Sequence, residues 1–183
     1  IPGEGGAALF LEASDIADKR GATILGKIKG FGNSIEFSND RGISVHSHVT
    51  LGSIAAALNE TSCDPGDLAF ISPHGSGSQK GDRSELRSIM KVCDKENHTI
   101  PICGMKPYTG HLGAASDIAE IILGIKAVQD KIAPATLNFR ESEKEFTELR
   151  ISGSHQQCEK DHFLSVSYGI GGQSSSVIVQ VLK

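Results

Sequence analysis

Two histidines lie in glycine-rich stretches of this sequence, where a loop can present a side chain to a ligand. His74 follows an apolar run in "FISPHGSGSQKGDRSE", and His111 lies five residues after Lys106 in "GMKPYTGHLGAAS". An imidazole donates hydrogen bonds and exchanges protons near neutral pH, so either ring could serve a reacting group. Taken singly, each side chain also has a plain alternative, as a surface histidine, a solvated lysine or a helix cap.

A third glycine-rich stretch, "SYGIGGQSSS", lies between two expected strands. Gly169, Gly171 and Gly172 indicate either a backbone held close to another group or a tight, strained connection. A phosphate-binding loop is a poor match for "HGSGSQKG", because its third glycine is displaced and Lys80 directly precedes Gly81.

The cysteine pattern indicates neither a metal site nor a disulfide framework. The four cysteines, at positions 63, 93, 103 and 158, are widely spaced and form no C-x-x-C pair. The histidine spacing likewise gives no ligand set for zinc. We therefore expect a reducing, cytoplasmic environment and a protein without a metal ion.

Charge and hydropathy exclude several classes of partner. The 183 residues carry a formal net charge of -4, with a pI near 6.0 and no block of basic residues. This excludes a nucleic-acid or anionic membrane surface as the expected partner and favours small molecules or proteins. The longest apolar stretch, residues 118–128, is interrupted by charged residues and a glycine, so we expect no membrane span. Because the sequence starts at Ile1 without a leader pattern, we expect a piece of a longer chain.

Apolar periodicity predicts strands alternating with helices. Strands are expected at residues 23–32, 68–71 and 99–103, and two more in "HFLSVSYGIGG" and "SSSVIVQVLK". Helices are expected at residues 14–21, 46–59, 82–93 and 110–130. The charged residues 140–150 are expected to form a solvated surface segment. Parallel strands with crossover helices, followed by a hairpin-like pair, predict an α/β fold with a mixed sheet and layered helices.

Four segments, taken in order, resemble the second half of the β-ketoacyl synthases, the condensing enzymes of fatty-acid and polyketide synthesis. "GEGGAALFLEASDIADKRGATILGKIKGFG" is similar to the family's G-E-G-(A/G)-x-x-x-L-E segment and the strand that ends in G-F-G. "PHGSGSQKGDRSE" is similar to H-G-T-x-T-x-x-G-D-x-x-E, with Ser76 and Ser78 where threonines are usual. "KPYTGHLGAASDIAE" and "SYGIGGQSSS" resemble two further family segments. The resemblance covers nearly the whole chain, 1–183, and implies the C-terminal half of a thiolase-like fold.

The resemblance also implies a reaction and its residues. In the family, decarboxylation of a malonyl thioester makes a carbanion that attacks an acyl group held on a cysteine. His74 and His111 match two histidines that hydrogen-bond the thioester oxygen as the enolate forms. The dipole of a helix starting at His111 would disfavour its cationic form. Lys106 matches a buried lysine that orders the site, and Glu85 and Glu120 match carboxylates near it.

Other features of the site and its partners follow from the same resemblance. Asp82, in the same motif as Glu85, is expected to support the site. The reaction needs no metal or organic cofactor, so none is expected. Acyl carrier protein would deliver the acyl and malonyl thioesters, and the complete fold usually forms a dimer.

Two departures from the family pattern shape the expectation. The family's nucleophilic cysteine belongs to the preceding N-terminal half, and none of the four cysteines here has its context at a helix start. In the loop formed by Gly169, Ile170, Gly171 and Gly172, isoleucine replaces the phenylalanine that gates the acyl tunnel. We therefore expect activity only together with a cysteine-bearing half. The alternatives are a non-catalytic partner resembling a chain-length factor and a homologue that only decarboxylates.

Overall fold

A mixed four-stranded sheet forms the centre of the computed structural model, which describes residues 2–38, 45–61, 63–93 and 99–182. The strand order is β1-β6-β5-β2. Strands β2 and β5 are parallel, whereas β6 is antiparallel to both β5 and β1. The strand bounds are β1 Gly26–Ile35, β2 Leu68–Ser72, β5 His162–Tyr168 and β6 Gln173–Val181. The predicted mixed sheet is therefore present, with the two closing strands as an antiparallel pair.

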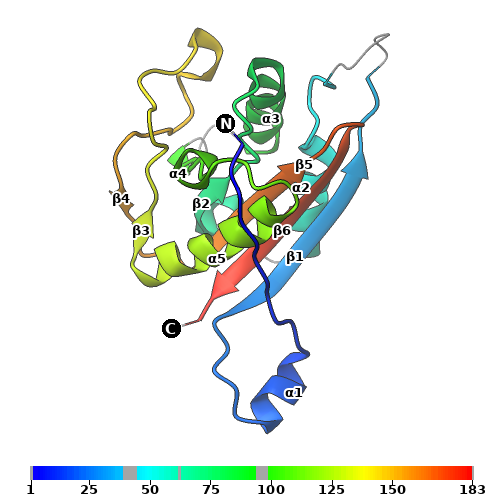
Figure 1. Cartoon of the computed structure of the whole chain (residues 1–183), viewed down its shortest axis with the longest axis vertical. Coiled ribbons are helices and arrows are strands. Elements are labelled where there is room, and N and C mark those ends of the chain that lie inside the picture. The colour runs from blue at the N-terminus through cyan, green and yellow to red at the C-terminus, as the bar shows by residue number, and fades with distance from the viewer. Residues whose placement is uncertain (1, 39–44, 62, 94–98, 183) are drawn as a thin grey trace.

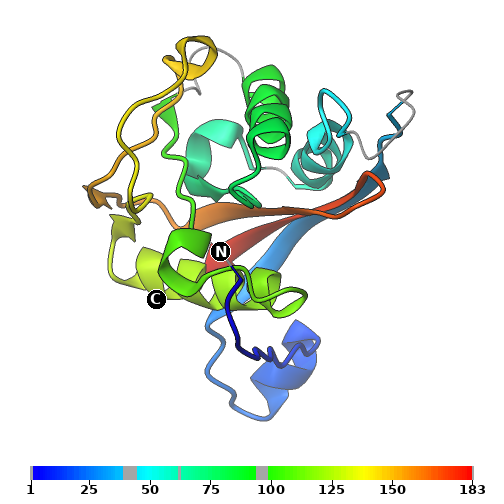
Figure 2. The same ribbon diagram turned by 45° about the horizontal axis from the view of Figure 1, so that its top comes forward.

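Helices cover both faces of this sheet. Helices α2 (Leu51–Glu60) and α3 (Gln79–Val92) lie on one face, and α5 (Ala115–Gln129) lies on the other (Figure 2). Successive residues of a strand point to opposite faces, so β5 contributes to two cores. Leu164 packs on the side of α2 and α3, and Phe163 packs on the side of α5.

Smaller elements extend from this frame. Helix α1 (Ser14–Lys19) lies at the end of an arm that leads away from the sheet (Figure 1). Short turns of helix occur as η1 (Pro65–Asp67), α4 (Lys106–Thr109) and η3 (Lys144–Phe146). A two-stranded ladder pairs β3 (Ile132–Ala133) with β4 (Gln156–Gln157).

Close helix-to-sheet packing depends on glycines at two contacts. A Cβ atom on Gly32 of β1 would lie 2.2 Å from the carbonyl oxygen of Ser53 in α2. A Cβ atom on Gly124 of α5 would lie 2.6 Å from the Phe163 ring. That ring stacks on Phe70 of β2 with 5.2 Å between centroids. Larger side chains at these two glycines would push the helices away from the sheet.

Several expectations about the elements were wrong in detail. The helix expected at residues 46–59 begins only at Leu51. The helix expected at residues 110–130 begins only at Ala115, because Gly110 and Gly113 have positive φ angles of 73° and 63° that interrupt it. Of the strand expected at residues 99–103, Ile102 alone makes bridges, one to Ile71 and one to Ile151. These bridges still place the segment beside β2.

The charged residues 140–150 also do more than face solvent. Phe146 and Leu149 are buried in the core under α2 and α3. Arg87 of α3 forms a hydrogen-bonded ion pair with Glu145 at 2.6 Å, which holds the segment against that helix. No described helix is long and apolar enough to cross a membrane.

Candidate active site

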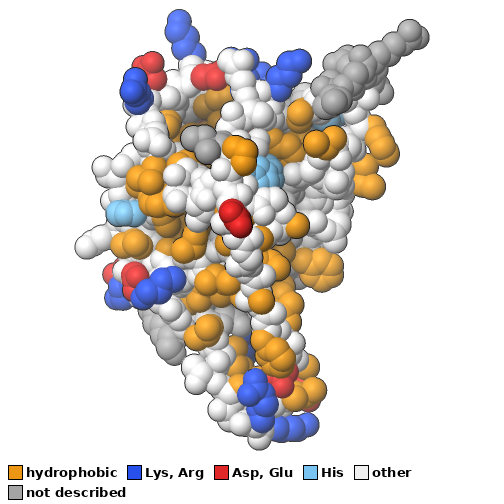
Figure 3. Space-filling view, viewed as in Figure 1, with side chains coloured by type: hydrophobic (Ala, Val, Ile, Leu, Met, Phe, Trp, Pro, Cys, Tyr) orange, Lys and Arg blue, Asp and Glu red, His pale blue; other side chains and the backbone are white. Residues whose placement is uncertain are grey.

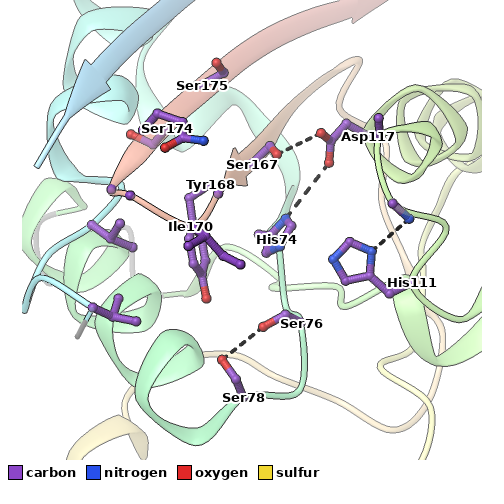
Figure 4. A pocket seen from close by; sticks show the side chains of 18 residues that line it. His74, Ser76, Ser78, His111, Asp117, Ser167, Tyr168, Ile170, Ser174 and Ser175 are labelled. Carbon is purple, nitrogen blue, oxygen red and sulfur yellow. Dashed lines mark hydrogen bonds and ion pairs between the residues drawn. The ribbon is translucent and has the colours of Figure 1, made fainter. Parts of the chain in front are cut away.

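A pocket of about 590 Å³ opens at the edge of the sheet where β2 and β5 both end. The loop after β2, the segment between α4 and α5, and the turn between β5 and β6 line it. Figure 4 shows His74 and His111 side by side there, with Tyr168 and Asp117 flanking His74. The carboxyl ends of parallel strands are where α/β sheets present functional loops, so the pocket lies at the expected edge.

The loop that carries His74 is held by a carboxylate from the next helix. Glu85 of α3 accepts the backbone N–H of His74 at 2.6 Å and that of Gly75 at 2.9 Å. Positive φ angles of 49° at Gly75 and 79° at Gly77 let the chain turn back toward α3. Glu85 therefore holds the backbone of the loop at His74 and Gly75.

The imidazole of His74 is buried and neutral. Its residue is 7% exposed, and the ring packs against Tyr168 with 4.6 Å between centroids. The pKa of His74 is lowered to about 3, mainly by burial and to a smaller extent by the charges of Lys106 and His111. Because the ring carries no charge at neutral pH, its 4.0 Å approach to Asp117 is not an ion pair.

His111 lies in the loop before α5 and not at the helix start that the sequence suggested. Its Nδ1 accepts the backbone N–H of Gly113 at 3.1 Å and lies 3.3 Å from the hydroxyl of Ser116. The ring centroids of His111 and His74 are 5.3 Å apart in an edge-to-face arrangement. A hydrogen bond to Nδ1 leaves the ring proton on Nε2, so His111 can donate from that nitrogen.

Lys106 and Glu120 form a buried ion pair close to the histidines. Their Nζ and Oε1 atoms are 2.8 Å apart, and the residues are 6% and 1% exposed. Burial raises the pKa of Glu120, and the charge of Lys106 opposes that shift. Neither side chain lines the pocket, but the charge of Lys106 reaches His74 and contributes to its lowered pKa.

The remaining predicted residues lie around the same pocket. Glu85 is fully buried, which raises its pKa to about 8, and burial also raises the pKa of Asp82 in the first turn of α3. The Oδ1 atom of Asp82 is buried and has no hydrogen-bond partner among the described residues. All six predicted polar residues therefore converge on one edge of the sheet. Of these six, only His74 and His111 line the pocket itself.

The turn between β5 and β6 forms one wall of the pocket. The side chain of Ile170 is free of close packing, with the residue 88% exposed. A Cβ atom on Gly172, whose φ is 85°, would lie 2.0 Å from the carbonyl oxygen of Glu36. Gly172 in turn accepts the backbone N–H of Glu36 at 2.9 Å. Glycine is therefore required where this turn crosses the chain after β1.

Sequence reasoning gave no role to several polar residues of the pocket, among them Asp117, Ser167 and Tyr168. Asp117 accepts a hydrogen bond from Ser167 at 2.8 Å, and Tyr168 packs on His74. The hydroxyl of Tyr168 lies against Gly81, where a Cβ atom would approach it to 2.0 Å. Asp117 stands three residues before Glu120, but that spacing alone does not indicate which way its side chain points.

Neither a cysteine nor a metal ligand set is found at the pocket. Its lining includes none of the four cysteines, and burial raises the pKa of Cys63 to about 11 and that of Cys103 further. Among the residues the structure describes, no group of three or more histidine, cysteine, aspartate or glutamate side chains could hold a metal ion. No described cysteine of this chain therefore lines the pocket, where it could hold an acyl group.

Comparison with known proteins identifies the family. Residues 25–140, more than half of the chain, match the family model described as beta-ketoacyl synthase, C-terminal domain. The chain belongs to this family. The match confirms the resemblance to the β-ketoacyl synthases and includes the segments that carry His74 and His111.

Relatives within the β-ketoacyl synthases match almost the whole chain. The tetracenomycin polyketide synthase ketoacyl synthase alpha subunit of Streptomyces glaucescens is 27% identical over 98% of this chain. The 3-oxoacyl-[acyl-carrier-protein] synthase 2 of Coxiella burnetii is 25% identical over 98%. The matches span 42% and 43% of those two proteins, so the chain corresponds to less than half of each.

Solved ketosynthase structures share the fold. A complex of a type II polyketide synthase acyl carrier protein with its ketosynthase, bound to a hexaketide, superposes with a TM-score of 0.83. It is 22% identical, and the match covers 94% of this chain and 42% of that one. A β-ketoacyl synthase from Burkholderia phymatum STM815 gives the same TM-score at 24% identity, over 94% of this chain and 41% of that one. The predicted thiolase-like α/β fold is thereby confirmed.

Proposed function

We propose that this chain forms the decarboxylation side of a β-ketoacyl synthase active site, which joins an acyl thioester to malonyl-acyl carrier protein by Claisen condensation. One observation carries the proposal. Two loops bring His74 and His111 together in one pocket, with 5.3 Å between their ring centroids, beside the buried pair of Lys106 and Glu120. A partner that only shaped an acyl tunnel would have no chemical need for this arrangement.

In the proposed reaction, the malonyl thioester loses its carboxylate as carbon dioxide. The electron pair of the broken C–C bond moves into the thioester as an enolate, and Nε2–H of His111 donates to the enolate oxygen. The enolate carbon then attacks the acyl thioester on a cysteine, a new C–C bond forms, and the cysteine thiolate leaves. His74 lies beside the same bound substrate, while Lys106 with Glu120, Glu85 and Asp82 keep the loops and the local charge in place.

The cysteine would come from an N-terminal ketosynthase half. A broad apolar surface supports such a partner, since hydrophobic side chains gather over α5, β1 and the arm leading to α1 (Figure 3). Phe31 of β1 points to the same face of the sheet as α5 and is 55% exposed, and Ile35 and Ile122 are exposed as well. Exposed apolar area of this kind is typical of an interface. In this proposal the chain alone catalyses no condensation.

Acyl carrier protein and a second copy of the complete fold are further proposed partners. One structural neighbour is a ketosynthase in complex with a type II polyketide synthase acyl carrier protein, which supports the first. The pocket opens to solvent along the turn that carries Ile170, where a thioester on a carrier arm could enter.

The test is a reconstituted assay of this chain with its cysteine-bearing half. Acyl and malonyl thioesters of acyl carrier protein are supplied, and carbon dioxide and 3-ketoacyl product are measured separately. We expect both products from the complete enzyme and no 3-ketoacyl product from the chain alone. Release of carbon dioxide without condensation would instead identify a decarboxylase. The absence of both products would identify a non-catalytic partner.

A further inference from the structure

Asp117 is a carboxylate of the pocket to which the family resemblance assigns no role. Its Oδ2 accepts a hydrogen bond from Ser167 at 2.8 Å, and its Oδ1 lies 4.0 Å from Nδ1 of His74 (Figure 4). Asp117 and Glu120 stand one turn apart on α5, so this helix directs one carboxylate toward His74 and the other toward Lys106. No other acidic side chain lines the pocket among the described residues.

The Nδ1 atom of His74 needs a partner, and Asp117 is the group that faces it. This atom is buried and makes no hydrogen bond among the described residues. Buried polar atoms are rarely left without a partner. The 4.0 Å separation exceeds an N–H···O hydrogen bond by about 1 Å, which a small rotation of Asp117 can close because its side chain is 39% exposed.

We propose that Asp117 is a positioning residue that places the proton of neutral His74 on Nδ1 and leaves the lone pair of Nε2 for the substrate. A carboxylate attracts an N–H group at this nitrogen and repels a lone pair there. The hydrogen bond from Ser167 is made to Oδ2, which leaves Oδ1 as the carboxylate oxygen that faces the ring. The catalytic meaning of this assignment rests on the function proposed above, but the tautomer itself does not.

The two histidines then present opposite groups to the substrate. Nδ1 of His111 accepts the N–H of Gly113, so His111 offers an N–H at Nε2. His74 would offer a hydrogen-bond acceptor at Nε2. The pocket thus has one imidazole donor for the thioester oxygen, where the family resemblance implies two. The acceptor is suited to an N–H or O–H group of the substrate or of a bound water.

Nuclear magnetic resonance of the complete enzyme, selectively labelled with ¹⁵N-histidine, tests the assignment. Long-range correlations distinguish a protonated ring nitrogen from one with a lone pair, and a His74→Gln sample identifies the His74 signals. We expect the proton of His74 on Nδ1 and that of His111 on Nε2. A proton on Nε2 of His74 in the unsubstituted enzyme overturns the proposal.

Variants of Asp117 show whether the carboxylate is the cause. Asp117→Ala should lower the ratio of the two His74 tautomers by roughly ten- to a hundredfold, the effect of losing a hydrogen bond to a charged group. Asp117→Glu should restore it, because a carboxylate returns. Asp130→Ala, at the exposed end of the same helix, is the matched control and should leave the His74 signals unchanged.

The outcomes separate this proposal from the function on which it builds. An Nδ1–H tautomer that persists in Asp117→Ala rejects Asp117 as its cause. An active condensing enzyme with Nε2–H on His74 rejects the tautomer assignment alone. If the reconstituted wild-type enzyme shows no condensing activity but His74 carries its proton on Nδ1, the proposed function is rejected and the tautomer assignment stands.

Discussion

Glu85 holds the backbone of His74 from a neighbouring helix. Its Oε1 accepts the His74 N–H at 2.6 Å, its Oε2 accepts the Gly75 N–H at 2.9 Å, and the side chain does not line the pocket. Eleven residues separate the two in sequence, so the loop and the first turns of α3 form one unit. The position of the proposed catalytic imidazole therefore depends on a residue that cannot touch the substrate.

Replacing Glu85 with alanine should destabilise the protein and weaken catalysis together. One buried and one partly buried N–H group would lose their acceptor, at up to about 1–3 kcal/mol each. We expect a Tm several degrees lower and a slower release of carbon dioxide in the reconstituted enzyme. Glu141→Ala removes an exposed carboxylate and should change neither quantity. An unchanged Tm for Glu85→Ala would show that the loop does not depend on this carboxyl.

The same residue predicts a pH dependence of stability. Burial raises the pKa of Glu85 to about 8 in the folded protein, from 4.5. The folded state therefore holds this proton more tightly than the unfolded state, and the associated stability is lost as the pH rises through 8. In scanning calorimetry, the Tm of the wild type should fall relative to that of Glu85→Gln between about pH 5 and pH 9. A constant difference across this range would exclude a raised pKa at Glu85.

Replacing only one member of the buried ion pair of Lys106 and Glu120 should strongly destabilise the protein. Lys106→Met leaves the Glu120 carboxyl buried without a cation, a change that typically costs about 3–5 kcal/mol. The double variant Lys106→Met/Glu120→Leu removes both polar groups, and urea unfolding should find it more stable than Lys106→Met. The exposed pair of Lys126 and Asp130 is the control, since its Lys126→Met variant should cost less than about 1 kcal/mol. Additive losses at Lys106 and Glu120 would contradict a coupled pair.

Much of the site could be predicted from sequence because its residues lie in short segments with strong local signals. The apolar run before His74 indicates β2, and the glycines after it indicate a loop. The charged periodicity from Asp82 onward indicates α3, which supplies Glu85 on the side facing that loop. In such a segment, the order of strand, loop and helix already places the side chains near one another.

Other features depend on long-range packing that local patterns do not contain. Asp117 lies on a correctly expected helix, but its approach to His74 follows from how α5 packs on β5. Phe146 and Leu149 lie in a charged stretch of sequence that predicts a solvated segment. A short helical turn brings both side chains into the core, and the local charge pattern does not predict that turn. The late start of α5 depends on positive φ angles at Gly110 and Gly113, which composition permits but does not require.

The exposed side chain of Ile170 should affect the choice of acyl chain. Ile170→Phe would add volume at the wall of the pocket, which the apolar Val45 and Val49 also line. We expect the preferred acyl length in the reconstituted enzyme to change more than the rate of carbon dioxide release. Leu137→Phe, on a partly exposed loop outside the pocket, serves as the control. Equal changes in both quantities would reject a gating role for Ile170.

His111 gives the most direct test of the proposed chemistry. Because its Nδ1 accepts the Gly113 N–H, its Nε2–H is oriented as a donor, and His111→Ala should slow carbon dioxide release by roughly two to three orders of magnitude. Acyl loading of the partner's cysteine should fall less, since that step depends on the thiolate. His162→Ala, at the far end of β5 from the pocket, is the matched control.

The double variant His74→Ala/His111→Ala should lose less than the product of the two single losses, because both rings act on the same bound substrate in one step. Carbon dioxide release and acyl loading are measured separately, since a variant that loses only loading would move His111 to the transacylation step. If His111→Ala released carbon dioxide at the wild-type rate, the enolate oxygen would have another donor, and the proposed role of His111 in decarboxylation would be rejected.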